Sequence, residues 1–220
     1  NFTWHLTNLT NYVNMSPYAW PAVEIENLTL KPSSLGSGMN GLPGEVIRTP
    51  ESRDDRVLLY LHGGGFVLPA LGAHREMLGN WCRELGCTVY LPDYRLAPEC
   101  PYPAGVRDAC TVVKRVWPVL QGRGVHFTEE LSLAGDSAGG NLAVCSALEL
   151  DAGARALTVG VLSIYPVTDH YSADFGSYTE RATGQMLTRD LMEWFWNTYL
   201  GDTAPDDATR ARPLLSQDLA

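Results

Sequence analysis

The sequence predicts an α/β fold built on a mainly parallel sheet, and three observations lead to that fold class. Apolar runs such as 56–61 and 157–165 indicate strands, and the near-continuous run at 56–61 is typical of a strand buried on both faces. Helical segments separate these runs, and successive βαβ units give parallel strands. A G-x-S-x-G pattern at 135–139 stands between an apolar run and an Ala/Leu-rich segment, which is a strand–turn–helix context.

Each element of this fold has its own signal. The alternation of apolar and polar residues at 23–30 predicts a half-buried strand, and 45–49 predicts a short partner that pairs with it antiparallel. Between them, the Gly/Ser/Pro-rich stretch 31–44 is a loop. The remaining core is predicted as strand 56–61, helix 73–85, strand 87–92, helix 104–117, strand 131–134, helix 139–150 and strand 157–165.

The character of the sequence changes after Pro166. Residues 169–185 are polar and irregular, whereas Thr188 caps a predicted helix over 189–200 that ends at Gly201. That helix is rich in aromatic residues over much of its circumference. It therefore lies in the core or forms a lid over an apolar pocket.

Composition limits the classes of partner. The chain has 220 residues, 45% of them hydrophobic, which suits one globular domain with a sizeable core. A net charge of −9 argues against nucleic acid and against anionic membrane surfaces. No apolar run approaches the roughly 20 residues that span a bilayer, so no stable membrane insertion is expected.

Two further motifs bear on the compartment. The five cysteines are an odd number without a C-x-x-C pair, so they are interpreted as buried or incidental thiols. Four N-x-S/T sequons begin at Asn1, Asn8, Asn14 and Asn27, and they would carry glycans in a secreted or lumenal protein. An Asn/Thr-rich segment also produces sequons by chance. The sequence favours that interpretation and a cytoplasmic location, with a secreted or lumenal one as the alternative.

Ser137 is the candidate nucleophile. A sharp strand-to-helix turn would place its Oγ in solvent, and Gly135, Asp136 and Gly139 form the rest of this nucleophile elbow. The N–H of Ala138, at the start of the following helix, would point to where an oxyanion forms.

A glycine loop is the second candidate part of the active site. His62-Gly63-Gly64-Gly65-Phe66 follows directly on the strand at 56–61, and glycines leave backbone N–H groups accessible to a ligand. Beside the elbow, Gly64 and Gly65 would complete an oxyanion hole with Ala138. His62 and Gly63 would support that loop, His62 as a hydrogen-bonding anchor rather than a general base. The loop lacks the Lys-Ser/Thr and G-x-G-x-x-G signatures of phosphate-binding loops.

Three motifs occur in one order: 62–65 (HGGG), 93–99 (DYRLAPE) and 135–140 (GDSAGG). In this the chain resembles the hormone-sensitive-lipase-like family of α/β-hydrolases, which includes microbial carboxylesterases. The resemblance implies an α/β-hydrolase fold with an eight-stranded sheet, a helical cap and hydrolysis of carboxylic esters. By analogy, 22–165 is a partial core, 1–21 and 166–213 form the cap, and 214–220 begins the rest of the core. The segment 94–99 would brace the oxyanion turn through Arg95 and Glu99.

The resemblance also implies a catalytic acid and a histidine after the seventh and eighth strands. Only six strands are predicted before Ala220, so the chain is expected to be truncated before both residues. Asp169 and His170 come too early in the topology, and neighbours on extended backbone point apart. Nothing in the sequence links His74 or His126 to Ser137, and His5 lies in the N-terminal cap segment at 1–21.

The functional prediction is a serine carboxylesterase acting on short-to-medium acyl esters through an acyl-enzyme, and close to inactive as this fragment. The alternative is a small-molecule receptor or other non-catalytic binding protein, because plant gibberellin receptors resemble the same family. The expected partners are a small ester substrate and, as one possibility, a second copy in a homodimer. No metal or organic cofactor is implied.

Overall fold

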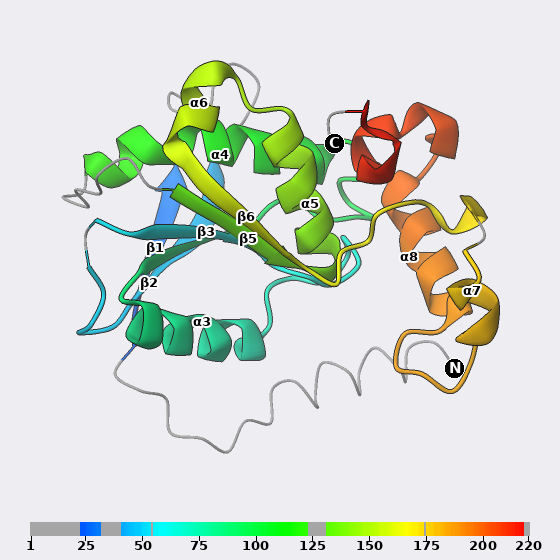
Figure 1. Ribbon diagram of the computed structural model, residues 1–220, viewed down its shortest axis with the longest axis horizontal. Coiled ribbons are helices and arrows are strands. Elements are labelled where there is room, and N and C mark those ends of the chain that lie inside the picture. The colour runs from blue at the N-terminus through cyan, green and yellow to red at the C-terminus, as the bar shows by residue number, and fades with distance from the viewer. Residues whose placement is uncertain (1–22, 32–40, 54, 123–130, 174, 218–220) are drawn as a thin grey trace.

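The computed structural model describes residues 23–31, 41–53, 55–122, 131–173 and 175–217. Its centre is a six-stranded sheet in the order β1-β2-β4-β3-β5-β6 (Figure 1). The four central and C-terminal strands run parallel: β4 (Thr88–Pro92), β3 (Val57–Leu61), β5 (Leu131–Asp136) and β6 (Thr158–Ile164). The predicted α/β class with a mostly parallel sheet is confirmed.

The first two strands form the antiparallel edge of the sheet. β1 (Glu24–Leu30) pairs with β2 (Leu42–Arg48) from Glu24↔Arg48 to Leu30↔Leu42, and β2 pairs antiparallel with β4. The predicted partner strand at 45–49 therefore begins three residues earlier, inside the predicted loop. Gly44 allows β2 to pair closely with β4, because a Cβ at this position would lie 2.7 Å from the Tyr90 hydroxyl of β4.

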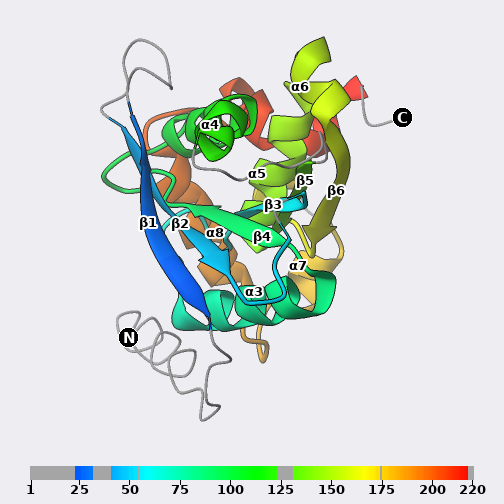
Figure 2. The same cartoon turned by 90° about the vertical axis from the view of Figure 1, so that its left-hand side faces the viewer.

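Helices cover both faces of the sheet (Figure 2). On one face, α3 (Gly72–Leu85) packs Leu78 and Cys82 against Tyr60 and Val89. On the other face, α4 (Ala104–Gln121) and α5 (Ser137–Leu148) pack against the larger apolar cluster. Strands β3, β4 and β5 are buried along most of their length, as their apolar runs predict, whereas residues 159–162 of β6 are exposed.

The segment after β6 lies at the end of the sheet where β5 passes into α5 (Figure 1). It holds α8 (Arg189–Leu200), the short helix α7 (Ser177–Glu180) and 3-10 turns at Tyr171–Ala173, Pro205–Asp207, Thr209–Ala211 and Pro213–Leu215. The buried amide of Asn141 on α5 donates to Val167 O and Ala211 O, and thereby holds both ends of this segment to the core. The predicted cap segment at 1–21 lies outside the described residues.

Helix ends show where local signals decide the structure. The Thr188 side chain accepts a hydrogen bond from Leu191 N, so the predicted N-cap of α8 is confirmed. Helix α6 (Ala152–Leu157) was not predicted, although Asp151 caps it by accepting from Ala154 N. Helix α7 lies inside the stretch predicted as irregular, and α4 continues past Pro118 to Gln121.

The five cysteines are free thiols, four of them buried, as predicted. The described helices include none that is both long and apolar enough to cross a membrane.

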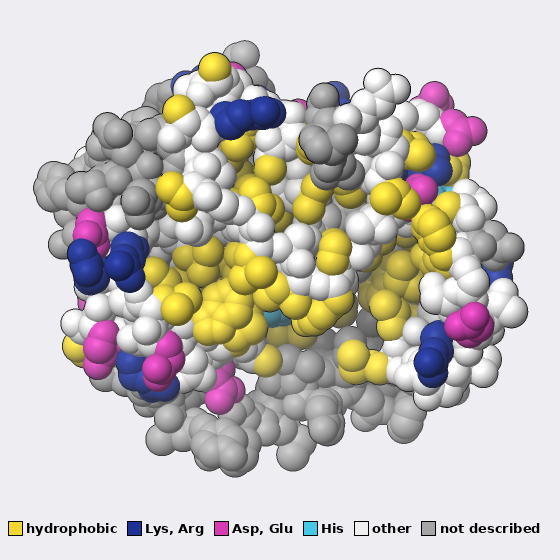
Figure 3. Space-filling view, in the orientation of Figure 1, with side chains coloured by type: hydrophobic (Ala, Val, Ile, Leu, Met, Phe, Trp, Pro, Cys, Tyr) yellow, Lys and Arg dark blue, Asp and Glu magenta, His cyan; other side chains and the backbone are white. Residues whose placement is uncertain are grey.

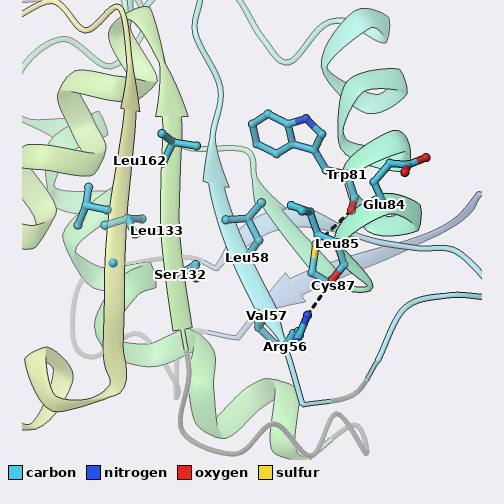
Figure 4. A pocket seen from close by; sticks show the side chains of 12 residues that line it. Arg56, Val57, Leu58, Trp81, Glu84, Leu85, Cys87, Ser132, Leu133 and Leu162 are labelled. Atoms are coloured by element: carbon cyan, nitrogen blue, oxygen red, sulfur yellow. Dashed lines mark hydrogen bonds between the residues drawn. The ribbon is translucent and has the colours of Figure 1, made fainter.

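An apolar hollow lies on the α3 face of the sheet, beside β6. Its volume is about 610 Å³, and Trp81 and Leu85 of α3 face Leu58 and Leu162 across it (Figures 3 and 4). Leu162 is 54% exposed, although it lies on a strand with an otherwise core-like sequence. This part of the sheet is therefore open to solvent in the part of the chain that the structure describes.

Candidate active site

Ser137 stands at the junction of β5 and α5, in the conformation that a nucleophile elbow requires. Its φ is +53°, a left-handed value that is rare for a residue other than glycine. The flanking glycines are sterically required. A Cβ on Gly139 would lie 1.9 Å from Leu61 O, and one on Gly135 would lie 2.4 Å from Gly139 O. The spacing of the two glycines therefore permits the close approach of β3, β5 and α5.

The glycine loop turns immediately beyond the end of β3. Gly64 has φ +126°, Gly65 +62° and Phe66 +65°, and Gly64 O accepts from Val67 N and Leu68 N. Gly65 is in contact with α8, because a Cβ there would come 2.2 Å from the ring of Phe195. The glycines thus let the backbone turn beneath an aromatic side chain.

Asp136 joins the loop to the elbow. Its Oδ1 accepts from Gly63 N at 2.8 Å and from the Tyr60 hydroxyl at 2.8 Å, and His74 Nε2 lies 3.5 Å away. Burial disfavours the charged carboxylate, but the hydrogen bonds with His74, Tyr60 and Gly63 N outweigh burial and lower the pKa of Asp136. The residue before Ser137 is therefore a buried anion that holds the loop in place.

His62 lies buried beneath the loop, where its Nδ1 is 2.8 Å from Gly63 O. Because a carbonyl only accepts, Nδ1 carries the proton. Burial lowers the pKa of His62 to about 4. The Tyr94 ring stacks on the imidazole, with centroids 4.4 Å apart, and its hydroxyl donates to His62 O at 2.7 Å. These contacts place His62 as a neutral anchor of the loop.

The bracing of this loop differs from the prediction. The Arg95 side chain pairs with Asp108 of α4 through three hydrogen bonds of 2.7–3.1 Å, and Glu99 is exposed. The segment instead reaches the glycine loop through the Tyr94 hydroxyl and through Ala97 N, which donates to Phe66 O. The expectation that Arg95 and Glu99 brace the turn was wrong, because their charged ends point to a helix and to solvent.

The elbow and the loop line one cavity of about 820 Å³. Gly63, Gly64, Gly65, Asp136 and Ser137 contribute its polar end. Its wider part is mainly apolar and comes from α3, the segment after β6 and α8, including Leu68, Met77, Phe175, Met186, Leu191 and Met192. In Figure 3 this cavity at Ser137 lies between the core and α8.

A second, small compartment of about 30 Å³ also touches Ser137. It lies between the glycine loop and α8, and its walls are Gly65, Phe66, Val167, Leu187, Met192, Phe195 and Trp196. Ser137 therefore stands between a large and a small apolar space.

His74 lines the large cavity together with Ser137, contrary to the expectation that nothing connects the two residues. Both of its ring nitrogens are engaged. Nδ1 accepts from Leu71 N at 2.9 Å, which places the proton on Nε2, opposite Asp136. His74 is thus a neutral donor to the carboxylate and has no free lone pair to act as a base.

The acid–base candidates that the sequence argues against have other partners, although Asp169 lines the same cavity as Ser137. Asp169 forms a buried ion pair with Arg212, and His170 Nδ1 contacts Ser172 Oγ at 2.8 Å. Burial, together with the nearby charge of Arg212, lowers the pKa of His170. His5 and His126 lie outside the described residues. Among the residues that the structure describes, no three His, Cys, Asp or Glu side chains gather as a metal site would need.

The structure thus brings the predicted site residues together: Ser137, Gly63, Gly64 and Gly65 line one cavity, Ala138 follows in the buried first turn of α5, and His62 lies beneath the loop. Sequence reasoning missed Tyr60, His74 and Phe195. Tyr60 precedes the HGGG motif by two residues on a buried strand, where a hydroxyl needs a partner, and this was the available signal. No sequence pattern marks His74 or Phe195, because each reaches the site only through the tertiary packing of its helix, α3 or α8.

Comparison with solved structures supports the fold that carries this site. The hyperthermophilic esterase from Pyrobaculum calidifontis superposes with a TM-score of 0.77 at 29% identity, over 98% of this chain and 66% of that chain. Among curated proteins, the ethyl acetate hydrolase of Pseudomonas putida is 36% identical over 79% of this chain and 55% of its own length. The carboxylesterase NlhH of Mycobacterium tuberculosis is 34% identical, over 84% of this chain and 56% of its own.

The family model that matches most of the chain gives the same assignment. The model described as alpha/beta hydrolase fold matches residues 58–220. Another, described as linear amide C–N hydrolases of the choloylglycine hydrolase family, matches residues 1–61, whose described part supplies β1–β3 of the common sheet. Mouse hormone-sensitive lipase is 33% identical over 72% of this chain and 21% of its own length. The chain belongs to the α/β-hydrolase fold family, among the relatives of hormone-sensitive lipase and the microbial carboxylesterases.

Proposed function

We propose that the protein is a serine carboxylesterase in which Ser137 forms an acyl-enzyme. One observation supports this most directly: a serine with φ +53° at a strand-to-helix turn lines the same cavity as Gly64 and Gly65. Esterase relatives make ester hydrolysis the reaction to test. The chain spans about half the length of the bacterial relatives it matches, so the activity of the whole protein is part of the proposal.

In the proposed reaction, Ser137 Oγ forms a bond to the acyl carbon while the carbonyl oxygen becomes an oxyanion. The N–H groups of Gly64, Gly65 and Ala138 donate to that oxyanion. Each such donor contributes on the order of 3 kcal/mol of transition-state stabilisation. The Gly63 N–H takes no part, because it donates to Asp136.

A general base must accept the Ser137 proton and return it to the leaving alcohol. His62 and His74 are unsuited to this role, because the first is a buried anchor and the second faces Asp136 with its only free N–H. We assign the base and its acidic partner to residues outside the described chain. The described chain alone should then retain only binding and oxyanion stabilisation, worth about 10³–10⁴ over water.

The two compartments beside Ser137 suggest how an ester binds. The alcohol must leave after acylation, so it belongs in the large cavity, whereas the acyl group stays attached and fits the small compartment. A space of about 30 Å³ holds one or two methyl-sized groups. Acetyl and propionyl esters with apolar alcohols are therefore the substrates of choice, at the short end of the predicted short-to-medium range.

Covalent labelling tests the nucleophile without requiring turnover. Ser137 Oγ displaces fluoride from a fluorophosphonate, so that an O–P bond forms, the P–F bond breaks and HF is lost. We expect slow labelling of the chain at Ser137, identified by peptide mass spectrometry, and none in Ser137→Ala. Labelling that is equal in both proteins would contradict the assignment.

A second candidate function is ligand binding without chemistry, as in a small-molecule receptor. It is favoured by the contacts that engage His62 Nδ1 and both ring nitrogens of His74, and by the mainly apolar cavity. Calorimetry with an uncleavable amide or ketone analogue separates the two. Equal, tight binding by wild type and Ser137→Ala, without fluorophosphonate labelling, would favour the receptor.

A further inference from the structure

The sequons near the N-terminus are not explained by ester hydrolysis, and their number exceeds what composition predicts. The first 30 residues contain five asparagines and five serines or threonines. A random order of those residues would produce about one N-x-S/T sequon. Four are present, at Asn1, Asn8, Asn14 and Asn27, so this count argues against the chance origin that was favoured above.

Of these, Asn27 is the one that the structure describes, and it occupies a position suited to a glycan. It lies in the middle of β1, opposite Glu45 of β2, and its side chain is exposed. Thr29, the hydroxyl residue of the sequon, is also exposed, whereas Leu28 between them is 1% exposed. Strand alternation therefore directs Asn27 and Thr29 to the same, solvent-facing side, and the buried Leu28 fixes that register.

The position on the sheet is also favourable. Within the described sheet, β1 is the edge strand and pairs only with β2 (Figure 2). Edge strands are protected in many proteins by charge or by bulk that opposes pairing with another sheet. Glu24 is exposed on the same strand. A glycan at Asn27 would add bulk at this edge, at a distance from the cavity at Ser137, whose lining contains no residue of β1.

We propose that Asn27 is an N-glycan acceptor site, modified when the chain enters the lumen of a eukaryotic secretory pathway. The co-reactant is a lipid-pyrophosphate-linked oligosaccharide. A bond forms between Asn27 Nδ2 and the anomeric carbon of the first sugar, and the bond from that carbon to the pyrophosphate oxygen breaks. The amide loses one proton and the lipid pyrophosphate leaves. Thr29 supplies the hydroxyl that the transferase recognises.

The test is to express the 220-residue chain behind a cleavable secretion signal in eukaryotic cells and to recover it from the medium. Removal of N-glycans by peptide N-glycosidase in ¹⁸O-water converts each occupied Asn to labelled Asp, which peptide mass spectrometry locates. We expect label at Asn27 in most molecules. Thr29→Ala should abolish it and Thr29→Ser should keep it.

Asn11→Gln is the matched control, because Asn11 lies in the same segment but outside any sequon. This variant should leave the gel mobility unchanged, whereas Asn27→Gln should increase it by one glycan. Secreted chain with an unlabelled Asn27 peptide would overturn the proposal, and so would label at Asn27 that survives Thr29→Ala.

Discussion

Gly63 N–H donates a 2.8 Å hydrogen bond to Oδ1 of Asp136, and this bond ties the glycine loop to the residue that precedes the candidate nucleophile. The two residues are far apart in sequence, yet a Cβ on Gly63 would lie 2.2 Å from Asp136 Oδ2. Any movement of the elbow is therefore transmitted to the loop. The variants below examine this connection and the packing around it.

Replacing Asp136 with Asn should weaken the connection. The amide retains an acceptor oxygen for Gly63 N and Tyr60 but loses the charge, so we expect about 1–3 kcal/mol less free energy of unfolding. The pKa of Asp136 is lower in the folded protein than in the unfolded chain. Its stabilising effect is therefore complete above about pH 4 and is lost as the pH falls through the folded value. Urea unfolding of both proteins at pH 7 and at pH 3 should show the difference shrinking in acid.

His62 produces a second acid-sensitive range. Its folded pKa of about 4 lies below the usual value, so the unfolded chain binds a proton that the folded protein does not. Stability should fall by about 3 kcal/mol as the pH drops from about 6.5 to about 4. His62→Asn keeps a donor near the position of Nδ1 and removes this titration. A pH dependence in that range that persists unchanged in the variant would contradict the assignment.

Two glycine substitutions form a matched pair. In Gly139→Ala, the new Cβ would meet Leu61 O at 1.9 Å, a backbone atom that cannot move aside, so we expect a loss above about 3 kcal/mol or failure to fold. Gly160→Ala adds the same methyl group on β6, where nothing lies within 4 Å. Its free energy of unfolding should change by less than about 0.5 kcal/mol. Thermal unfolding compares the two, and similar losses would show that the elbow is not sterically constrained.

The strained backbone of Ser137 has a measurable consequence. Glycine adopts a φ of +53° without strain, whereas alanine does not. Both Ser137→Gly and Ser137→Ala remove the hydroxyl, and Ser137→Gly should be more stable by about 1 kcal/mol. Equal unfolding free energies of the two variants would mean that the serine carries no strain.

The apolar hollow beside β6 should make the chain self-associate. Leu162 is 54% exposed there, so Leu162→Lys removes apolar surface and should cost little stability. We expect weaker binding of a hydrophobic dye and a shift towards monomer in analytical ultracentrifugation. Glu84→Gln, at the rim of the same hollow, shifts the net charge by the same one positive unit without removing apolar surface and serves as the control.

Much of this architecture could be predicted from local patterns. The buried strands β3, β4 and β5 are near-continuous apolar runs, and the cap residues Thr188 and Gly201 delimit α8. The apolar run of β6 also located a strand, but residues 159–162 of that strand are exposed. The elbow and the glycine loop were located because short motifs impose their own backbone geometry. Helix α6 was missed, because its six residues give too little periodicity to recognise.

The tertiary partners of the site could not be predicted in the same way. Phe195 contacts Gly65 because α8 packs against the glycine loop, and His74 lies opposite Asp136 because α3 packs beside the elbow. No spacing in the sequence encodes such distant contacts. Likewise, Arg95 was expected at the loop by analogy and instead pairs with Asp108, because a buried carboxylate on α4 requires a cation.

The most direct test of the proposed site is a crystal structure of the chain with a phosphonate bound covalently to Ser137. The phosphonyl oxygen should lie about 2.7–3.1 Å from the backbone nitrogens of Gly64, Gly65 and Ala138. An oxygen turned away from these three nitrogens, with the 63–65 amides directed elsewhere, would contradict the account.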